Sequence, residues 1–204
     1  MTSKFKYTYS LNTSINSPYC YSPKYFTKNE CDNIIDYALK SEKNNLVDAK
    51  VENSDGGSEI NSYRISRISF IPSNDSNISW VFSKITEAIN SLNEQFFQFD
   101  VNQIETLQFS VYDAKVGGHY GRHVDIMNTK NETTRKLSGS IQLSSPYSYE
   151  GGNLEFIVKK EADVLPREQG TLILFPSYVM HEVKPVTKGV RYSLVFWVTG
   201  PPFK

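Results

Sequence analysis

The chain has 204 residues, in which 22 Lys and Arg balance 22 Asp and Glu, so its formal net charge at pH 7 is zero. A chain without a broad positive field is not expected to bind nucleic acid or an anionic membrane surface. Its length suffices for one domain with its own hydrophobic core, and we expect a single domain over residues 1–204.

The first segment, MTSKFKYTYSLNTS, is polar and lacks the apolar run of a secretory signal. No segment approaches the roughly 20 apolar residues of a membrane-spanning helix. We therefore expect a soluble, cytoplasmic protein. The cysteines, Cys20 and Cys31, are too few for a disulfide scaffold and lack C-x-x-C spacing, so we interpret both as reduced packing residues.

The segment TKNECDNIIDYALKSEK predicts the first helix, from about residue 28 to about residue 43. Thr27 and Glu30 have the spacing of a capping box, in which each side chain accepts a hydrogen bond from the backbone N–H of the other residue. Apolar residues then follow at helical intervals, namely Ile34, Ile35, Ala38 and Leu39.

Two segments between this helix and the next have different characters. The first, ENSDGGSEINS at residues 52–62, is rich in Ser, Asn and Gly and predicts a surface loop. The second, YRISRISFIP at residues 63–72, alternates in polarity and predicts a strand. Its Arg64 and Arg67 could reach a substrate or form a solvated strand face, and we favour the solvated face.

A second helix is predicted after Ser76 and is expected to end before the FFQFD run at residues 96–100. Its apolar residues form one stripe, made of Ile78, Val81, Phe82, Ile85, Ala88, Ile89 and Leu92. Such a stripe packs on a core, so we assign it no chemistry.

From Ile104 onward the chain consists of short runs rich in β-branched and aromatic residues, separated by Gly, Pro and Ser. No helical pattern separates these runs, which favours antiparallel strands over βαβ units. We predict a mainly β fold, a double-stranded β-helix of the jelly-roll, cupin-like kind, with the helices packed outside. Residues of about 1–100 would support a core of about 101–204, and Phe196 and Trp197 are interpreted as core residues.

The candidate chemistry begins with His123 and Asp125 in GGHYGRHVDIM, which would project to the same face of an extended segment. This pair alone is weak evidence, but His181 follows the apolar run GTLILFP and a Pro-Ser turn. Two histidines and a carboxylate are typical of non-haem Fe(II) oxygenases. They also occur in zinc hydrolases and in non-catalytic metal-binding proteins. We expect His119 to lie in a loop or to support the site from outside the ligand set, rather than to be a ligand.

Arg191 stands ten residues after His181, at the start of the run VRYSLVFW. A guanidinium presents a planar fork that matches a carboxylate, so this residue could hold the far acid group of a dicarboxylic co-substrate. A zinc-bound water would not require such a residue. Arg191 therefore favours the oxygenase interpretation over the zinc hydrolase.

The ordered motifs HYGRHVD, GGNLEF, GTLILFPS and HEVKPVTKGVRYSLVFWV resemble those of the Fe(II)- and 2-oxoglutarate-dependent dioxygenases. The similarity is to the prolyl-4-hydroxylase-like branch that includes the PKHD-type hydroxylases, and it extends over residues 63–203. It implies that His123, Asp125 and His181 bind iron and that Arg191 binds the C5 carboxylate of 2-oxoglutarate. Tyr112 matches a tyrosine that lines the 2-oxoglutarate pocket.

The same resemblance implies a reaction. It uses Fe(II), 2-oxoglutarate and O2, hydroxylates an unactivated C–H bond, and releases succinate and CO2. Peptidyl proline is the first substrate candidate, and a free amino acid or another small molecule is the alternative. A metal-binding jelly roll that binds a partner without catalysis is the alternative from a different class. The resemblance leaves open the oligomeric state and whether ascorbate is needed.

Three further residues and two loops complete the expectations. Gly151 and Gly152 match a tight turn of the family, where positive φ or a close approach is required. Tyr120 could face the substrate or pack at the mouth of the barrel. A lid that excludes water is expected over the site, and we nominate residues 52–62 and, second, residues 127–136.

Overall fold

The computed structural model describes residues 18–40, 46–52, 58–59, 62–127 and 133–203. Two α-helices lie in the N-terminal half, α1 (Lys28–Lys40) and α2 (Ser79–Leu92). A π-helical turn (Asn93–Phe97) extends α2, and a 3-10 turn (Ala114–Val116) precedes the candidate site. None of the helices within these ranges is long and apolar enough to cross a membrane.

The strands form two main antiparallel sheets and a small hairpin. The large sheet has the order β1 (Cys20–Ser22), β14 (Leu172–Pro176), β10 (Thr134–Gln142), β16 (Val186–Gly200), β8 (Leu107–Asp113), β6 (Arg67–Ile71) and β2 (Val47–Asp48), with β7 (Gln103–Ile104) and β11 (Tyr149–Gly151) also paired to β16. The smaller sheet has the order β13 (Asp163–Val164), β12 (Leu154–Phe156), β15 (His181–Val183), β9 (His119–His123) and β5 (Arg64–Ile65). The hairpin joins β3 (Val51–Glu52) to β4 (Ser58–Glu59).

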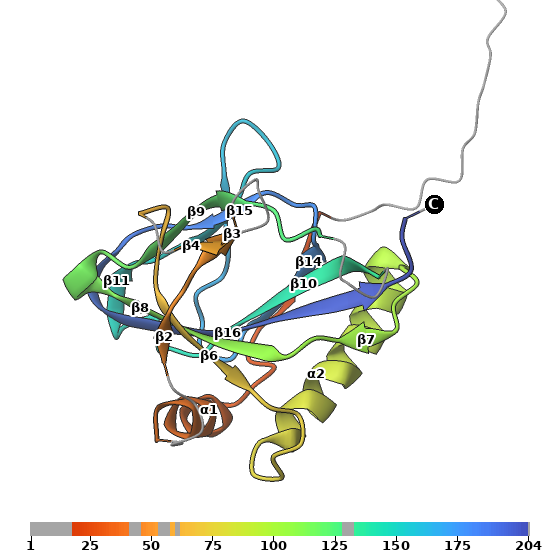
Figure 1. Cartoon of the computed structure of the whole chain (residues 1–204), viewed down its shortest axis with the longest axis horizontal. Coiled ribbons are helices and arrows are strands. Elements are labelled where there is room, and N and C mark those ends of the chain that lie inside the picture. The colour runs from red at the N-terminus through yellow and green to blue at the C-terminus, as the bar shows by residue number, and fades with distance from the viewer. Residues whose placement is uncertain (1–17, 41–45, 53–57, 60–61, 128–132, 204) are drawn as a thin grey trace, which may run out of the picture.

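The two helices cover the outer face of the large sheet, as Figure 1 shows. Along β16, Leu194 and Phe196 are buried in the same apolar cluster as Ile34 of α1 and Ile85 of α2. Arg191 and the alternate residues after it point to the opposite face, toward the smaller sheet. The mainly β, jelly-roll architecture with flanking helices is therefore confirmed, and the candidate site lies between the sheets.

The predicted capping box of α1 is present. The Thr27 N–H donates to Glu30 Oε2 at 2.7 Å, and the Glu30 N–H donates to Thr27 Oγ1 at 3.2 Å. The helix is described as far as Lys40, and residues 41–45, in which its predicted end falls, lie outside the described residues.

The helical region after Ser76 is longer than predicted. It does not end before FFQFD but continues as the π-helical turn to Phe97 and stops at Gln98, which has a φ of 53°. Phe97 is buried in the cluster between helices and sheet, and this burial favours the extra turn. Asn93 closes the turn, since its side chain donates to the Phe99 carbonyl at 2.9 Å and accepts from the Phe99 N–H at 3.0 Å.

The predicted strand over residues 63–72 is divided between the two sheets. Arg64 on β5 pairs with Tyr120 of β9, whereas Arg67 on β6 pairs with Val111 of β8. The chain changes sheets at Ser66, so the two arginines lie in different surroundings. Of the two nominated lid loops, residues 53–57, 60–61 and 128–132 lie outside the described residues.

Candidate metal centre and co-substrate pocket

A β-bulge in β9 shapes the candidate site. His181 of β15 pairs with His123, but Val183, two residues further, pairs with Tyr120, which is three residues from His123. The extra residue on β9 turns Tyr120 and His123 to the same face, although residues three apart on a regular strand would face opposite ways. Their rings stack with centroids 3.6 Å apart and an interplanar angle of 15°.

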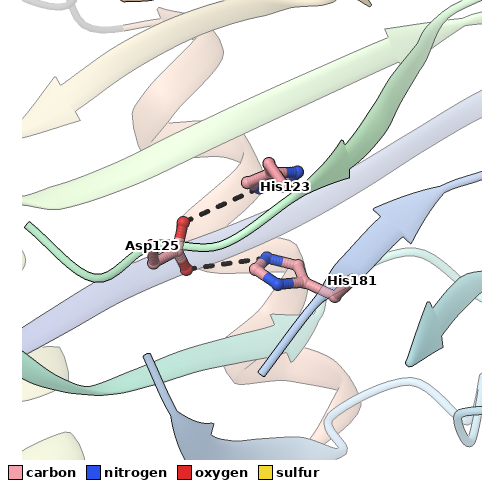
Figure 2. A group of neighbouring side chains, drawn as sticks. All are labelled: His123, Asp125 and His181. Atoms are coloured by element: carbon pink, nitrogen blue, oxygen red, sulfur yellow. Dashed lines mark ion pairs between the residues drawn. The ribbon is translucent and has the colours of Figure 1, made fainter. Parts of the chain in front are cut away.

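His123, Asp125 and His181 converge on one point between the sheets (Figure 2). His123 Nε2 lies 3.6 Å from Asp125 Oδ1, and His181 Nε2 lies 3.6 Å from Asp125 Oδ2. One ligand atom from each residue lies within 4.8 Å of the others. The backbone N–H of Asp125 donates to the Ser177 carbonyl at 2.9 Å, which ties the segment after β9 to the turn before His181.

The hydrogen bonds of the two histidines fix which ring nitrogen is free. His123 Nδ1 lies 2.8 Å from the Gly121 carbonyl, and His181 Nδ1 lies 2.9 Å from the Val179 carbonyl. A carbonyl can only accept, so Nδ1 of each neutral ring carries the proton. The lone pair of each Nε2 then points to Asp125, as expected where an imidazole is held for a metal.

The charges of this cluster also suit a cation. Burial and the neighbouring His181 lower the pKa of His123 to about 4, so His123 is neutral at pH 7. Burial alone would raise the pKa of Asp125, but His181 and His123 together with the side chains of Ser138 and Trp197 hold that pKa below its ordinary value. A buried carboxylate beside imidazole lone pairs is a donor set that fits a divalent ion such as Fe(II).

Arg191 is a buried cation without an anionic partner among the described residues. Only 1% of the residue is exposed, and its Nη2 donates to Gln142 Oε1 at 2.8 Å. Nη1 donates to Ser193 Oγ at 3.3 Å, and Nε has no hydrogen-bond partner. The Tyr112 ring centroid lies 5.4 Å from its Cζ. A guanidinium that is already buried among neutral neighbours can bind a carboxylate with little further desolvation of the protein.

The turn at Gly152 also serves Arg191. Gly151 and Gly152 have φ values of 70° and 61°, as the tight turn requires. A Cβ at Gly152 would lie 2.8 Å from Val186 Cγ2 and 3.2 Å from Arg191 Cδ. The missing side chain therefore leaves room for the arginine.

One cavity of about 990 Å³ joins these parts. His123, Asp125, His181, Arg191 and Tyr112 all line it. Its walls from the large sheet include the polar side chains of Gln108, Ser140 and Ser193. Polar side chains that face the interior are unusual for a small barrel that only packs a core, but they suit a charged ligand.

The interpretation of Trp197 as a core residue is wrong, whereas Phe196 is fully buried as predicted. Trp197 lines the cavity, because it lies six residues after Arg191 and therefore on the same face of β16. It faces Asp125 and lowers the pKa of that carboxyl, although its Nε1 has no partner within hydrogen-bond distance. Strand alternation counted from Arg191 would have placed it correctly.

The remaining residues singled out from the sequence fall into two groups. Tyr120 lines the cavity and also packs on the ring of His123. His119 lies apart from the cluster, with its ring nitrogens 2.7 Å from the Gly117 carbonyl and 3.0 Å from the Ser62 carbonyl. Arg67 is exposed as favoured, but the solvated-face interpretation is wrong for Arg64, which is only 8% exposed and lines the cavity.

Comparison with known proteins agrees with this geometry. Residues 107–199 match the model of the 2OG-Fe(II) oxygenase superfamily. Over these residues the chain is similar to this superfamily. A PKHD-type hydroxylase of Teredinibacter turnerae is 38% identical over 86 residues, which are 40% of this chain and 38% of that protein. The chain thus spans less than half the length of this curated relative.

Solved structures share the fold. A prolyl-4-hydroxylase of Pseudomonas putida has a TM-score of 0.70 at 18% identity, over 91% of this chain and 94% of its own. A prolyl hydroxylase of Trichoplax adhaerens, solved with a hypoxia inducible factor peptide fragment, has a TM-score of 0.72 at 18% identity. That alignment covers 90% of this chain and 84% of the other. At these identities the likeness establishes a shared jelly-roll fold.

Proposed function

We propose that this protein is an Fe(II)- and 2-oxoglutarate-dependent dioxygenase that hydroxylates an unactivated C–H bond, with succinate and CO2 as co-products. One observation carries the proposal. A single cavity is lined both by the His123, Asp125 and His181 cluster and by Arg191. A metal site next to a buried cation that lacks an anionic partner suits a metal-binding dicarboxylate.

In this proposal His123, Asp125 and His181 hold Fe(II) through two Nε2 atoms and one carboxylate oxygen. When bound, the iron would supply the activation of O2 that is coupled to oxidative decarboxylation of the co-substrate. The chain itself holds the ligands in place. The Gly121 and Val179 carbonyls orient the imidazoles, and the Ser177 carbonyl anchors the backbone of Asp125.

Arg191 would bind the C5 carboxylate of 2-oxoglutarate, with Tyr112 beside it. Gln142 and Ser193 hold the guanidinium without neutralising it, so its charge stays available to the ligand. The apolar side chains of Phe175, Leu154 and Val183 line the same cavity and exclude water around His181. A zinc hydrolase would need the metal ligands but no such arginine.

For the hydroxylated molecule we propose peptidyl proline first, giving 4-hydroxyproline, and a free amino acid or other small molecule as the alternative. The solved peptide complex of the Trichoplax adhaerens prolyl hydroxylase supports a peptide. The cavity supports it as well, because about 990 Å³ is near the upper end of ligand pockets and exceeds what the co-substrate alone would fill.

The test is formation of succinate from 2-oxoglutarate with Fe(II), with and without ascorbate, and mass spectrometry of proline-containing peptides and free amino acids for one added oxygen. Arg191→Ala should chiefly raise the apparent KM for 2-oxoglutarate, whereas Arg67→Ala, at an exposed arginine, should leave it unchanged. Absence of turnover together with absence of iron binding would favour a non-catalytic partner-binding protein.

A further inference from the structure

A second buried arginine, Arg64, lines the cavity that holds the metal ligands. It is 8% exposed and pairs with Tyr120 between β5 and β9. Its Cζ lies 4.5 Å from the centroid of the Tyr120 ring, and that ring stacks on His123. The guanidinium therefore lies one aromatic ring away from a proposed iron ligand.

The hydrogen-bonding capacity of Arg64 is mostly unused. Its Nε donates to Ser66 Oγ at 3.1 Å, and within the described ranges neither terminal nitrogen has a hydrogen-bond partner. These nitrogens are not fully enclosed by protein atoms, and the guanidinium lies over the ring of Tyr120, which lines the same cavity. A guanidinium has five N–H donors, and burying them without partners is costly.

The other charges that line the cavity already have roles. Arg135 and Glu105 form a bidentate ion pair, with N–O distances of 2.8 and 2.7 Å. Asp125 would serve the metal, and Arg191 the co-substrate. The side chain of Lys50 is exposed, so water solvates its charge. Among the described residues no carboxylate lies within ion-pair distance of Arg64, which is thus the buried charge in the lining of this cavity that remains unmatched.

We infer that Arg64 binds a carboxylate of the molecule that is hydroxylated, so that the substrate of this site is anionic. This inference rests on the proposed function, because it concerns the second ligand of the same cavity. The cation–π contact with Tyr120 orients the guanidinium, and the fork can receive two carboxylate oxygens. A substrate carboxylate bound to Arg64 would be only a few covalent bonds away from a substrate carbon placed beside His123.

That spacing suits two sources of the carboxylate. One is the α-carboxylate of a free amino acid, and the other is an acidic side chain next to the target residue of a peptide. A neutral peptide would instead offer Arg64 only backbone carbonyls. Carboxylates and carbonyls differ in charge, so matched pairs of ligands distinguish them.

The experiment measures dissociation constants by calorimetry on the protein loaded with Fe(II) and 2-oxoglutarate without oxygen. Two ligand pairs are compared: L-proline with L-prolinamide, and N-acetyl-Pro-Asp-amide with N-acetyl-Pro-Asn-amide. In one of the pairs we expect the carboxylate to bind more tightly than the amide, by about tenfold or more. Preference in the first pair identifies a free amino acid, and preference in the second an acidic peptide.

Two variants and a control assign the preference to Arg64. Arg64→Gln should abolish it, Arg64→Lys should retain part of it, and Arg67→Gln should leave it unchanged. The dissociation constant for 2-oxoglutarate should stay the same in all three. Circular dichroism checks that each variant is folded, and Arg64→Lys keeps the comparison valid if the glutamine variant unfolds.

Equal affinity for both members of each pair, binding of none of the four ligands, or a preference that persists in Arg64→Gln would overturn the inference. Failure of the proposed function has a different signature, since the wild-type protein would then bind neither Fe(II) nor 2-oxoglutarate in the same titrations.

Discussion

His181 and His123 are direct partners across the antiparallel strands β15 and β9, and the β-bulge that follows brings Tyr120 onto the ring of His123. His123 is therefore held from two sides, by the Gly121 carbonyl at its Nδ1 and by a stacked ring over its face. Tyr120 is partly buried, and this burial raises its pKa, so the stacked ring is a neutral phenol. Its packing restrains the direction in which His123 Nε2 points.

Replacement of Tyr120 by alanine should weaken metal binding. Partners that orient a ligating histidine typically contribute about 10- to 100-fold in metal affinity, and we expect a loss at the lower end of that range for Tyr120→Ala. Tyr120→Phe keeps the ring and should keep the affinity. Calorimetric titration with Mn(II) measures both. Equal affinity in the alanine variant and the wild type would show that the stacking does not orient His123.

The meeting of His123, Asp125 and His181 was predictable from the sequence, but the residues that support them were not. His123 and Asp125 are two apart, and His181 follows a strand and a turn, so their meeting follows from strand alternation and barrel closure. The sequence HYGRH does not predict the bulge at residues 120–123, because every residue there is partly polar or small. Tyr120 therefore could not be assigned to a face.

Arg64 illustrates a second limit of prediction from the sequence. If YRISRISF were one continuous strand, Arg64 and Arg67 would lie on opposite faces, and the sequence says nothing of which sheet each residue joins. The change of sheet at Ser66 depends on pairing with β9 and β8, whose residues lie more than forty positions later. Burial of Arg64 is thus a tertiary effect.

Metal binding should stabilise the protein against heat. A metal that binds only the folded state, at a free concentration of 100 times its Kd, adds about 2.7 kcal/mol, or a rise in Tm of about 5–10 °C for a chain of this size. His181→Ala should abolish this increment. His119→Ala should keep it, because His119 lies apart from the cluster. Differential scanning fluorimetry with and without Mn(II) measures the rise in Tm. A rise retained in His181→Ala would contradict the proposed ligand set.

Gln142 should control the affinity for the co-substrate through Arg191. Its Oε1 accepts from Arg191 Nη2 at 2.8 Å, and its Nε2 donates to the Pro166 carbonyl at 3.3 Å. Gln142→Leu should raise the KM for 2-oxoglutarate about tenfold, as loss of a hydrogen bond to a charged group implies. Gln142→Glu should raise it further, because a carboxylate beside Arg191 competes with the co-substrate. A lower KM in the glutamate variant would refute this role.

The two thiols should be inert in the native protein over the neutral pH range. Burial raises the pKa of Cys20 and of Cys31 to about 12, whereas an exposed thiol has a pKa of about 8.5. Because the folded pKa is the higher one, the stability that comes from burying the neutral thiols is complete below about pH 8.5 and falls as the pH rises toward 12. Iodoacetamide at pH 8 should modify the cysteines in denaturant but only slowly in the native state. Equal rates in both states would contradict this expectation.

The capping box of α1 should contribute to stability without affecting the site. Thr27→Ala removes the side-chain acceptor for the Glu30 N–H and should lower the free energy of unfolding by about 1 kcal/mol, or the Tm by about 2–4 °C. Thr27→Ser keeps the acceptor and should be nearly neutral. Glu30→Ala should cost more than Thr27→Ala, because Glu30 also binds Lys84 of α2 at 2.7 Å. Urea unfolding measures the free energies, and the KM for 2-oxoglutarate should be unchanged in all three variants. A smaller cost for Glu30→Ala than for Thr27→Ala would show that the ion pair between the helices contributes nothing.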